Sequence, residues 1–350
     1  STSISAAYGI ARAKMLSGDQ SHTVAVIGDG SFTGGLAFEA MNNAGRFKKN
    51  FIVILNDNKM SISKNVGAFP RYLTTVRIQP WYIRVKKNTE KVLSKIPLFG
   101  RPISAFLRRS KSKIKNLVYK NTLFDCFGFT YIGPIDGHDI PELENALSAA
   151  KKINSPVLLH VVTKKGKGYL PAEENPGTFH GIGKFDIDSG EPISSHKGFS
   201  AEFGNTLCEL AEKDKKICAI TAAMAKGTGL EKFSIYHKER FFDVGIAEEH
   251  AVTFACGLAS KGMRPVFAVY STFLQRSYDQ IIHDAAMSGL HIVLAIDRAG
   301  IVGDDGETHQ GVFDVSMLNS IPNVTIFSPT YFDGLKCALN SAIYVCNNVA

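Results

Sequence analysis

The sequence predicts an α/β fold of two domains, each a mostly parallel sheet with helices on both faces. Short apolar runs rich in Val and Ile alternate with longer segments of helical spacing, the pattern of parallel sheets. A length of 350 residues suits two domains of ordinary size. Two polar triplets, Gly28-Asp29-Gly30 and Asn56-Asp57-Asn58, each follow such an apolar run.

The first domain is expected to span residues 1–165. Helices are predicted where apolar residues recur every three or four positions, and strands where Val and Ile form short runs. In chain order we expect a helix at 4–16, a strand at 23–27, a helix at 36–46, strands at 51–55 and 126–132, a turn at 136–139, a helix at 141–152 and a strand at 157–162.

Residues 166–198 are predicted to be a linker, because they are rich in Gly and Pro and show no sustained periodicity. A second α/β domain is expected over 199–350. In chain order we expect a helix at 199–212, strands at 217–220 and 241–244, a helix at 247–260, a strand at 265–269, a helix at 273–287, strands at 291–296 and 324–327, and a helix at 343–350 that runs into an unfinished connection.

The two triplets should lie at the carboxyl ends of neighbouring parallel strands, where open α/β sheets bind ligands. Asp29 and Asn58 are short oxygen donors of the kind that Mg²⁺ prefers, together with phosphate oxygens. Gly28 and Gly30 let the backbone pass close to a diphosphate, and the helix that begins near Gly35 directs N–H groups at it. A tight turn is the alternative for either triplet alone, but the pair indicates a diphosphate and magnesium site.

The net charge of +8 is unevenly distributed along the chain. Between Arg84 and Lys120 there are twelve Lys or Arg and one acid, Glu90, a net charge of +11, so the rest of the chain carries −3. We interpret residues of about 70–122 as a solvated basic insertion in the first domain. Attraction of anionic substrates, a membrane or nucleic acid is the alternative. Four aromatic residues among the charges predict that part of the insertion packs: Trp81, Tyr82, Phe99 and Phe106.

The six cysteines lie far apart and include no Cys-x-x-Cys pair, which predicts buried, reduced thiols in a cytoplasmic protein. No apolar run approaches the length of a membrane span, and no signal peptide opens the chain. The first residue is Ser1 rather than Met, so we expect the chain to begin inside a longer protein.

The second domain offers an acid at the start of an apolar helix. Glu248 lies in the string Asp243 to His250, where the helix dipole stabilises carboxylates, so N-terminal capping is the alternative to a catalytic role. The string Tyr270 to Arg276 joins a strand to a helix. Within it Phe273 suits either core packing or stacking on a flat ring.

The segment Asp297 to Gly311 is too polar and too rich in Gly for a core element. Long polar loops at strand ends usually carry function. Arg298 suits an anion anchor there, and His309 suits a proton-transfer group, although a lone loop histidine is most often only solvated. His138 and His180 are weaker candidates.

With these strings the chain resembles thiamine-diphosphate enzymes, and among them the 1-deoxy-D-xylulose-5-phosphate synthase family of the transketolase superfamily. The resemblance is carried by residues 1–5, 28–35, 243–253, 270–276 and 297–311. It implies that Asp29, Asn58 and the carbonyl of Met60 bind Mg²⁺. It implies as cofactor-binding residues Gly28, Asp29, Gly30, Ser31, Phe32, Asn58, Met60, Glu248, Phe273 and Arg276. It implies as catalytic residues Glu248, His309, Arg298, Tyr270 and Asp305, with Tyr270 and Arg298 holding a substrate phosphate.

The resemblance also implies a cytoplasmic homodimer that uses thiamine diphosphate and Mg²⁺ and does not bind nucleic acid. Its reaction would condense pyruvate with D-glyceraldehyde 3-phosphate, with loss of CO₂, for isoprenoid, thiamine and pyridoxal synthesis. A third, C-terminal domain and a segment before Ser1 would be absent from this chain. Transketolase-type ketol transfer and a catalytically silent paralogue remain as alternatives. Residues 270–276 and 297–311 favour the synthase, and intact Asp29, Asn58 and Glu248 argue against a silent protein.

Overall fold

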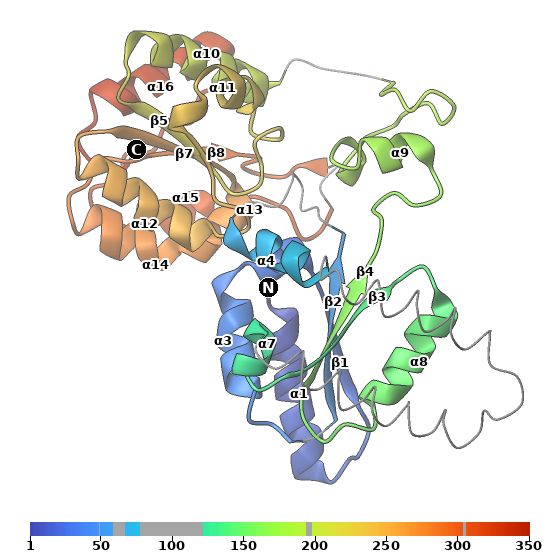
Figure 1. The fold of residues 1–350 in the computed structure, drawn as a ribbon. Helices are drawn as coiled ribbons and strands as arrows, with labels where there is room; N and C mark the ends of the chain where they lie inside the picture. Colours follow the sequence, from blue (N-terminus) through green and yellow to red (C-terminus); the bar gives the residue numbers. More distant parts are fainter. Residues whose placement is uncertain (49, 59–66, 78–121, 194–197, 304–305) are drawn as a thin grey trace, which may run out of the picture. The chain divides into compact units, whose positions relative to one another are not determined.

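The computed structural model describes all residues except 49, 59–66, 78–121, 194–197 and 304–305, and it forms two compact units (Figure 1). The described residues of 1–164 form the first unit, and those of 165–350 form the second. Most of the predicted basic insertion, with its four aromatic residues, lies outside the described residues, as do Met60 and Asp305.

The sheet of the first unit has the strand order β1-β2-β4-β3, and all its strands are parallel. Its elements are α1 (Ser3–Ser17), β1 (Thr23–Gly28), α2 (Asp29–Phe32), α3 (Gly35–Ala44), β2 (Phe51–Asp57), α4 (Ala68–Arg77), α7 (Leu123–Cys126), β3 (Thr130–Asp136), α8 (Ile140–Ala150) and β4 (Val157–Val162). The strand predicted at 126–132 begins later, because Thr122 and Asp125 form a capping box that starts α7 instead.

The edge strand β1 is buried on one face only, although its run of Val, Ala and Ile is typical of a buried parallel strand. Ala25 and Ile27 face the core, whereas Val24 and Val26 are 45% and 60% exposed. The strands β2 and β4 are buried almost throughout. One face of this sheet packs on a core of aromatic and aliphatic side chains that α1, α3, α4 and α7 share. The other face carries the smaller cluster under α8.

The beginning of the insertion packs against the first unit. Leu73 of α4 is buried, and the Tyr72 hydroxyl accepts a hydrogen bond from the Leu123 N–H at 2.8 Å. This contact joins residues on either side of the undescribed segment, and it holds α4 beside α7.

The second unit has a parallel sheet of strand order β6-β5-β7-β8, with α10 and α16 on one face and α12 with its neighbours on the other (Figure 1). Its elements are α9 (Leu170–Glu174), η1 (Thr178–His180), α10 (Phe199–Lys213), β5 (Ile217–Thr221), α11 (Glu231–Tyr236), η2 (Lys238–Arg240), β6 (Phe241–Asp243), α12 (Glu248–Ala259), β7 (Arg264–Tyr270), α13 (Ser271–Leu274), η3 (Gln275–Ser277), α14 (Tyr278–Gln280), η4 (Ile281–Ala286), β8 (Val293–Asp297), α15 (Asp314–Asn319) and α16 (Phe332–Tyr344).

The helix predicted at 273–287 is broken into short α, 3₁₀ and π segments. At the first break the Ser277 hydroxyl donates to the Leu274 carbonyl at 2.9 Å, so a side chain competes with the backbone ladder. Such changes of helix type are frequent near functional sites. The predicted linker also has structure, because α9, η1 and an aromatic cluster of Tyr169, Phe179 and Phe185 lie within it.

The strand predicted at 324–327 does not form. Val349 and Ala350 lie beside β8 instead, with the Leu294 N–H donating to the Ala350 carbonyl at 2.7 Å. Val324 makes only an isolated bridge to Val349. The prediction of a helix at 343–350 was also wrong. The helix α16 ends at Tyr344, and the last residues form hydrogen bonds beside β8 instead.

All six cysteines are free thiols. Cys208, Cys218 and Cys256 are buried as predicted, but Cys126 and Cys337 are exposed, so the prediction of burial was wrong for these two. Within the ranges that the structure describes, no helix is both long enough and apolar enough to cross a membrane.

Candidate functional site

The two polar triplets meet at one edge of the first sheet. Gly28 at the end of β1 pairs in register with Asn56 of β2, so the carboxyl ends of the two strands are adjacent. Asp29 follows β1 as the first residue of α2, and Asn58 follows the last residue of β2. Asp29 is 2% exposed, and its Oδ1 accepts a hydrogen bond from the Gly30 N–H at 3.0 Å.

The backbone around Asp29 is open on one side and anchored on the other. A Cβ added at Gly28 would meet no atom within 4 Å, so the backbone there leaves space for a ligand. The Ser31 carbonyl accepts a hydrogen bond from the Ser1 hydroxyl at 2.9 Å, which ties the chain start to α2. Phe32 is fully buried and stacks on Phe69 with ring centroids 5.0 Å apart, so only its main chain could face a ligand.

The donors at this edge suit a hard cation that also binds phosphate oxygens. They are one carboxylate and one amide, with the predicted carbonyl of Met60 lying outside the described residues. Mg²⁺ is held in proteins by few such oxygens, with substrate phosphate completing its shell. The residues present therefore fit the predicted group. No cluster of three or more His, Cys, Asp or Glu able to hold a metal occurs among the residues that the structure describes.

In the second unit, Glu248 is the first residue of α12 and is 1% exposed. Burial raises the pKa of its carboxyl group, and the charge of Arg276 opposes that rise. One guanidinium nitrogen of Arg276 donates to Glu248 Oε2, and another lies 3.2 Å from Glu249 Oε1. Two residues from separate strings of the sequence are thus brought together. A buried acid with a raised pKa and a specific cationic partner is a common feature of functional sites.

Asp243 fixes the loop that delivers Glu248. Its Oδ1 accepts hydrogen bonds from the Ala223 N–H at 2.8 Å and from the Gly245 N–H at 3.0 Å. These bonds tie the end of β5 to the start of the loop before α12. No role was predicted for Asp243 from the sequence. The signal that could have revealed it is a short acid at a strand end followed two residues later by a glycine, a pattern typical of turns.

Four predicted residues form a continuous row in the second unit. The Arg298 guanidinium carbon lies 4.3 Å from the centroid of the Tyr270 ring. That ring is stacked with Phe273 at a centroid distance of 6.1 Å. Phe273 meets the His309 ring edge-to-face at 5.1 Å. The pairing of β7 with β8 places Tyr270 opposite Asp297 and thereby brings the two strings together. A row of rings that ends in a guanidinium and an imidazole presents flat surfaces and polar tips.

The described residues of the loop from Asp297 to Gly311 are joined by backbone hydrogen bonds and by one amide side chain. Gly300 and Gly311 form an antiparallel bridge. Gln310 accepts from the Val302 N–H at 2.7 Å and donates to the Val302 and Gly306 carbonyls. Gln310 was not predicted, because one glutamine in a polar loop carries no sequence signal.

The backbone is strained where the loop begins. Arg298 has a φ of 55°, and its N–H donates to Asp297 Oδ1 at 2.7 Å. Left-handed non-glycine residues persist only where the surroundings determine them, often at functional sites. A Cβ at Gly227 would lie 1.9 Å from the Tyr270 hydroxyl oxygen, so only glycine there lets this ring take its place in the row. The predicted catalytic residue Asp305 lies outside the described residues.

The two weaker histidine candidates have structural partners. His138 Nε2 accepts a hydrogen bond from the Lys164 N–H at 2.9 Å, which secures the chain after β4. His180 Nδ1 lies 2.6 Å from Lys165 Nζ. Burial, and then the charge of Lys165, lower the pKa of His180.

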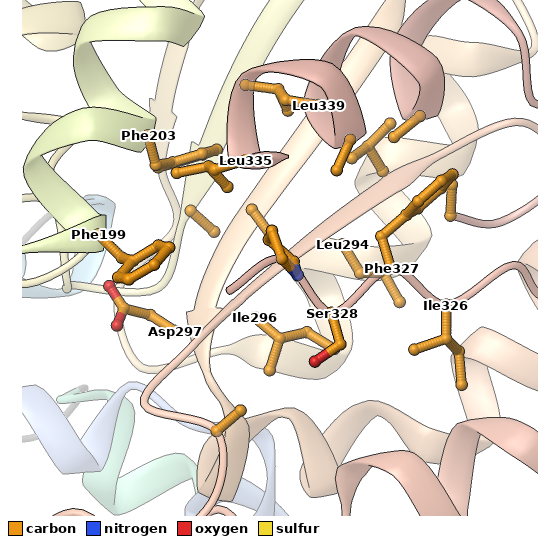
Figure 2. Close-up of a pocket in the computed structure, with 18 of the residues that line it drawn as sticks. Phe199, Phe203, Leu294, Ile296, Asp297, Ile326, Phe327, Ser328, Leu335 and Leu339 are labelled. Atoms are coloured by element: carbon orange, nitrogen blue, oxygen red, sulfur yellow. The ribbon is translucent and has the colours of Figure 1, made fainter. Parts of the chain in front are cut away.

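A cavity of about 470 Å³ lies within the second unit (Figure 2). Its walls are largely apolar, with Phe199 and Phe203 of α10 facing Leu335 and Leu339 of α16. It reaches the row of four residues only at Arg298. Residues of β8 and residues 324–329, where the predicted strand does not form, both line this cavity.

The chain matches two protein-family models. Residues 1–163 match the model described as 1-deoxy-D-xylulose-5-phosphate synthase, and residues 197–349 match the transketolase pyrimidine binding domain. Among solved structures, a transketolase from Leishmania mexicana is similar over 99% of this chain and 58% of that chain, with 18% identity and a TM-score of 0.41.

Curated relatives named 1-deoxy-D-xylulose-5-phosphate synthase are much closer in sequence. The protein from Clostridium kluyveri is 56% identical over 94% of this chain, and that from Natranaerobius thermophilus is 53% identical over 100% of it. The chain spans about half the length of these relatives, 53% and 56%. The resemblance predicted from the sequence is thereby confirmed, and the chain belongs to the 1-deoxy-D-xylulose-5-phosphate synthase family.

Proposed function

We propose that this chain carries the cofactor sites of a thiamine-diphosphate-dependent enzyme. The enzyme condenses pyruvate with D-glyceraldehyde 3-phosphate, with loss of CO₂, to give 1-deoxy-D-xylulose 5-phosphate. It works as a cytoplasmic homodimer with Mg²⁺. When bound, thiamine diphosphate supplies an electron sink for making and breaking carbon–carbon bonds.

The observation that carries this proposal is the environment of Glu248. A carboxyl group that is 1% exposed, with its pKa raised by burial, can exchange a proton with a bound heterocycle. Arg276 holds the carboxyl oxygen in place from one side. A helix cap would need neither this degree of burial nor a cationic partner.

The first unit would hold the diphosphate and the metal. Asp29, Asn58 and the carbonyl of Met60 would be the protein ligands to Mg²⁺. The main chain of Gly28, Gly30, Ser31 and Phe32 would line the diphosphate, and the N–H groups at the start of α3 would point at it.

The second unit would hold the pyrimidine ring and the substrates. Phe273 would stack on the ring, with Arg276 beside it. Arg298 and Tyr270 would anchor the phosphate of glyceraldehyde 3-phosphate, because a guanidinium presents a planar fork to phosphate oxygens. His309, at the other end of the row, would move a proton at the reacting carbonyl oxygen or orient it.

The test compares the complete protein with its Glu248→Gln variant in the presence of thiamine diphosphate and Mg²⁺. We expect CO₂ and the five-carbon product only when pyruvate and glyceraldehyde 3-phosphate are both present, and a near-total loss in the variant. Transfer of a ketol group from a ketose phosphate without CO₂ would favour the transketolase alternative. Cofactor binding without turnover of any donor would favour a silent paralogue.

A further inference from the structure

A buried polar chain crosses three strands of the first sheet. His160 of β4 lies 2.7 Å through Nδ1 from the Tyr131 hydroxyl of β3, and 2.9 Å through Nε2 from Asp57 Oδ2 of β2. His160 is 0% exposed and Asp57 is 1% exposed, and Tyr131 is buried as well. A hydroxyl that donates to Nδ1 and an Nε2–H that donates to the carboxylate satisfy both nitrogens of the ring.

Stability alone does not explain the buried polar chain of Asp57, His160 and Tyr131. It lies on the face of the sheet that otherwise packs aromatic and aliphatic side chains, such as Leu55 and Leu158. Replacement of a buried polar pair by apolar groups of similar size is often neutral or stabilising. The buried carboxylate of Asp57 is therefore weak evidence for a role in core stability alone.

The position of Asp57 in β2 indicates another use for its carboxylate. It is the last residue of β2, immediately before Asn58. Its carbonyl accepts a hydrogen bond from the Thr163 N–H at 3.0 Å, and the neighbouring Asn56 accepts one from the Thr163 hydroxyl at 2.7 Å. Side-chain and main-chain bonds together tie the end of β2 to β4 and to the residue that follows it. Asn58 is the first residue beyond this tie.

We propose that Asp57, His160 and Tyr131 are positioning residues that hold the end of β2 so that Asn58 meets the metal and the diphosphate. This inference rests on the proposed function. The three residues would act through the backbone, because their side chains are enclosed in the core. Removal of a residue that orients a metal ligand typically lowers metal affinity by about 10- to 100-fold.

The test measures thiamine diphosphate binding to the complete protein by calorimetry over a series of Mg²⁺ concentrations. His160→Gln removes at least one of the two ring bonds, and Tyr131→Phe removes only the outer hydroxyl. The matched control is Leu158→Ala, two residues before His160 on β4 and fully buried, which weakens the same core without touching the polar chain. Thermal unfolding without cofactor reports the stability of each variant.

We expect His160→Gln to raise the Mg²⁺ concentration for half-maximal binding by about 10- to 100-fold. Tyr131→Phe should raise it by about 2- to 10-fold, the range of one neutral hydrogen bond. Leu158→Ala should lower the unfolding temperature and leave that concentration unchanged. If His160→Gln fails to fold, Tyr131→Phe decides the question.

Unchanged Mg²⁺ dependence in the polar-chain variants, with normal binding by the wild type, would overturn the positioning role and leave the proposed function intact. A shift in Leu158→Ala equal to that in His160→Gln would also overturn it, because general weakening of the core would then explain the loss. Failure of the wild type itself to bind thiamine diphosphate would overturn the proposed function and the inference together.

Discussion

The two units each bury an acid close to the carboxyl ends of their strands, but they pair it differently. In the first unit Asp57 is bonded to His160, and both side chains are enclosed. In the second unit Glu248 is bonded to Arg276, whose side chain is 28% exposed. The enclosed pair can influence a ligand only through the backbone, whereas the second pair lies close to the surface. Under the proposed function, similar sheets would therefore support a positioning role in one unit and direct chemistry in the other.

The direction of the pKa shift of Glu248 adds to this difference between the two buried acids. Burial raises the pKa of Glu248 above its ordinary value, so folding favours the protonated form. The stability linked to this group is then present below the ordinary pKa and is lost as the pH rises through the raised one. The positive charge of Arg276 opposes the shift.

The largest expected effect is that of Glu248→Gln, which keeps the size but removes the titrating group. Turnover should fall by about 10²- to 10⁴-fold, the usual contribution of an acid–base group. Binding of thiamine diphosphate, measured by calorimetry, should persist. Hydrogen exchange at the cofactor's thiazolium carbon, followed by NMR, should slow in parallel. Exchange as fast as in the wild type would reduce Glu248 to a helix cap and remove the contrast between the two buried acids.

Asp29→Ala should be next in size, and it affects the other unit. Loss of a charged ligand should weaken Mg²⁺-dependent binding of thiamine diphosphate by more than the roughly 10- to 100-fold that loss of an outer partner costs. Calorimetry at several Mg²⁺ concentrations measures this loss. A variant that binds the cofactor as tightly as the wild type would remove Asp29 from the site.

Arg298→Ala tests the anion-binding role in the row of four residues. Its removal should raise the KM for glyceraldehyde 3-phosphate by roughly tenfold to a hundredfold, since a hydrogen bond to a charged group contributes about 1.5–3 kcal/mol. The KM for pyruvate should change much less, and unphosphorylated glyceraldehyde should be almost indifferent. Equal losses with both acceptors would mean that Arg298, at its left-handed φ, shapes the loop instead of binding phosphate.

The smallest effect should come from Arg276→Met, which removes the charge that opposes the burial of Glu248. The pKa of Glu248 should rise further, because burial then acts without a nearby cation. The acidic limb of the pH–rate profile for hydrogen exchange at the thiazolium carbon should move to higher pH. Lys336→Met, which breaks the exposed ion pair with Glu202 in the same unit, is the matched control and should leave the profile in place. A profile that does not move in Arg276→Met would mean that this arginine does not tune the acid.

Several features of the protein were evident from the sequence alone. The alternation of apolar runs and helical segments predicted two α/β domains with parallel sheets, because strand and helix periods are local properties of the chain. The triplets around Asp29 and Asn58, and the string that contains Glu248, were found because each motif is contiguous. Segment 324–327 was apolar enough to predict a strand, but pairing depends on what else reaches β8, and Val349 and Ala350 do so.

Only the tertiary structure decided which of these residues meet. Asp57 and His160 are 103 residues apart in sequence, and Glu248 and Arg276 are 28 apart. No local period relates such positions, because strand order and loop closure determine their contacts. The row from Arg298 to His309 exists because β7 and β8 are neighbours, and Gln310 closes the loop that supports it. The sequence therefore determined which groups are available for chemistry, and the fold determined how they are paired.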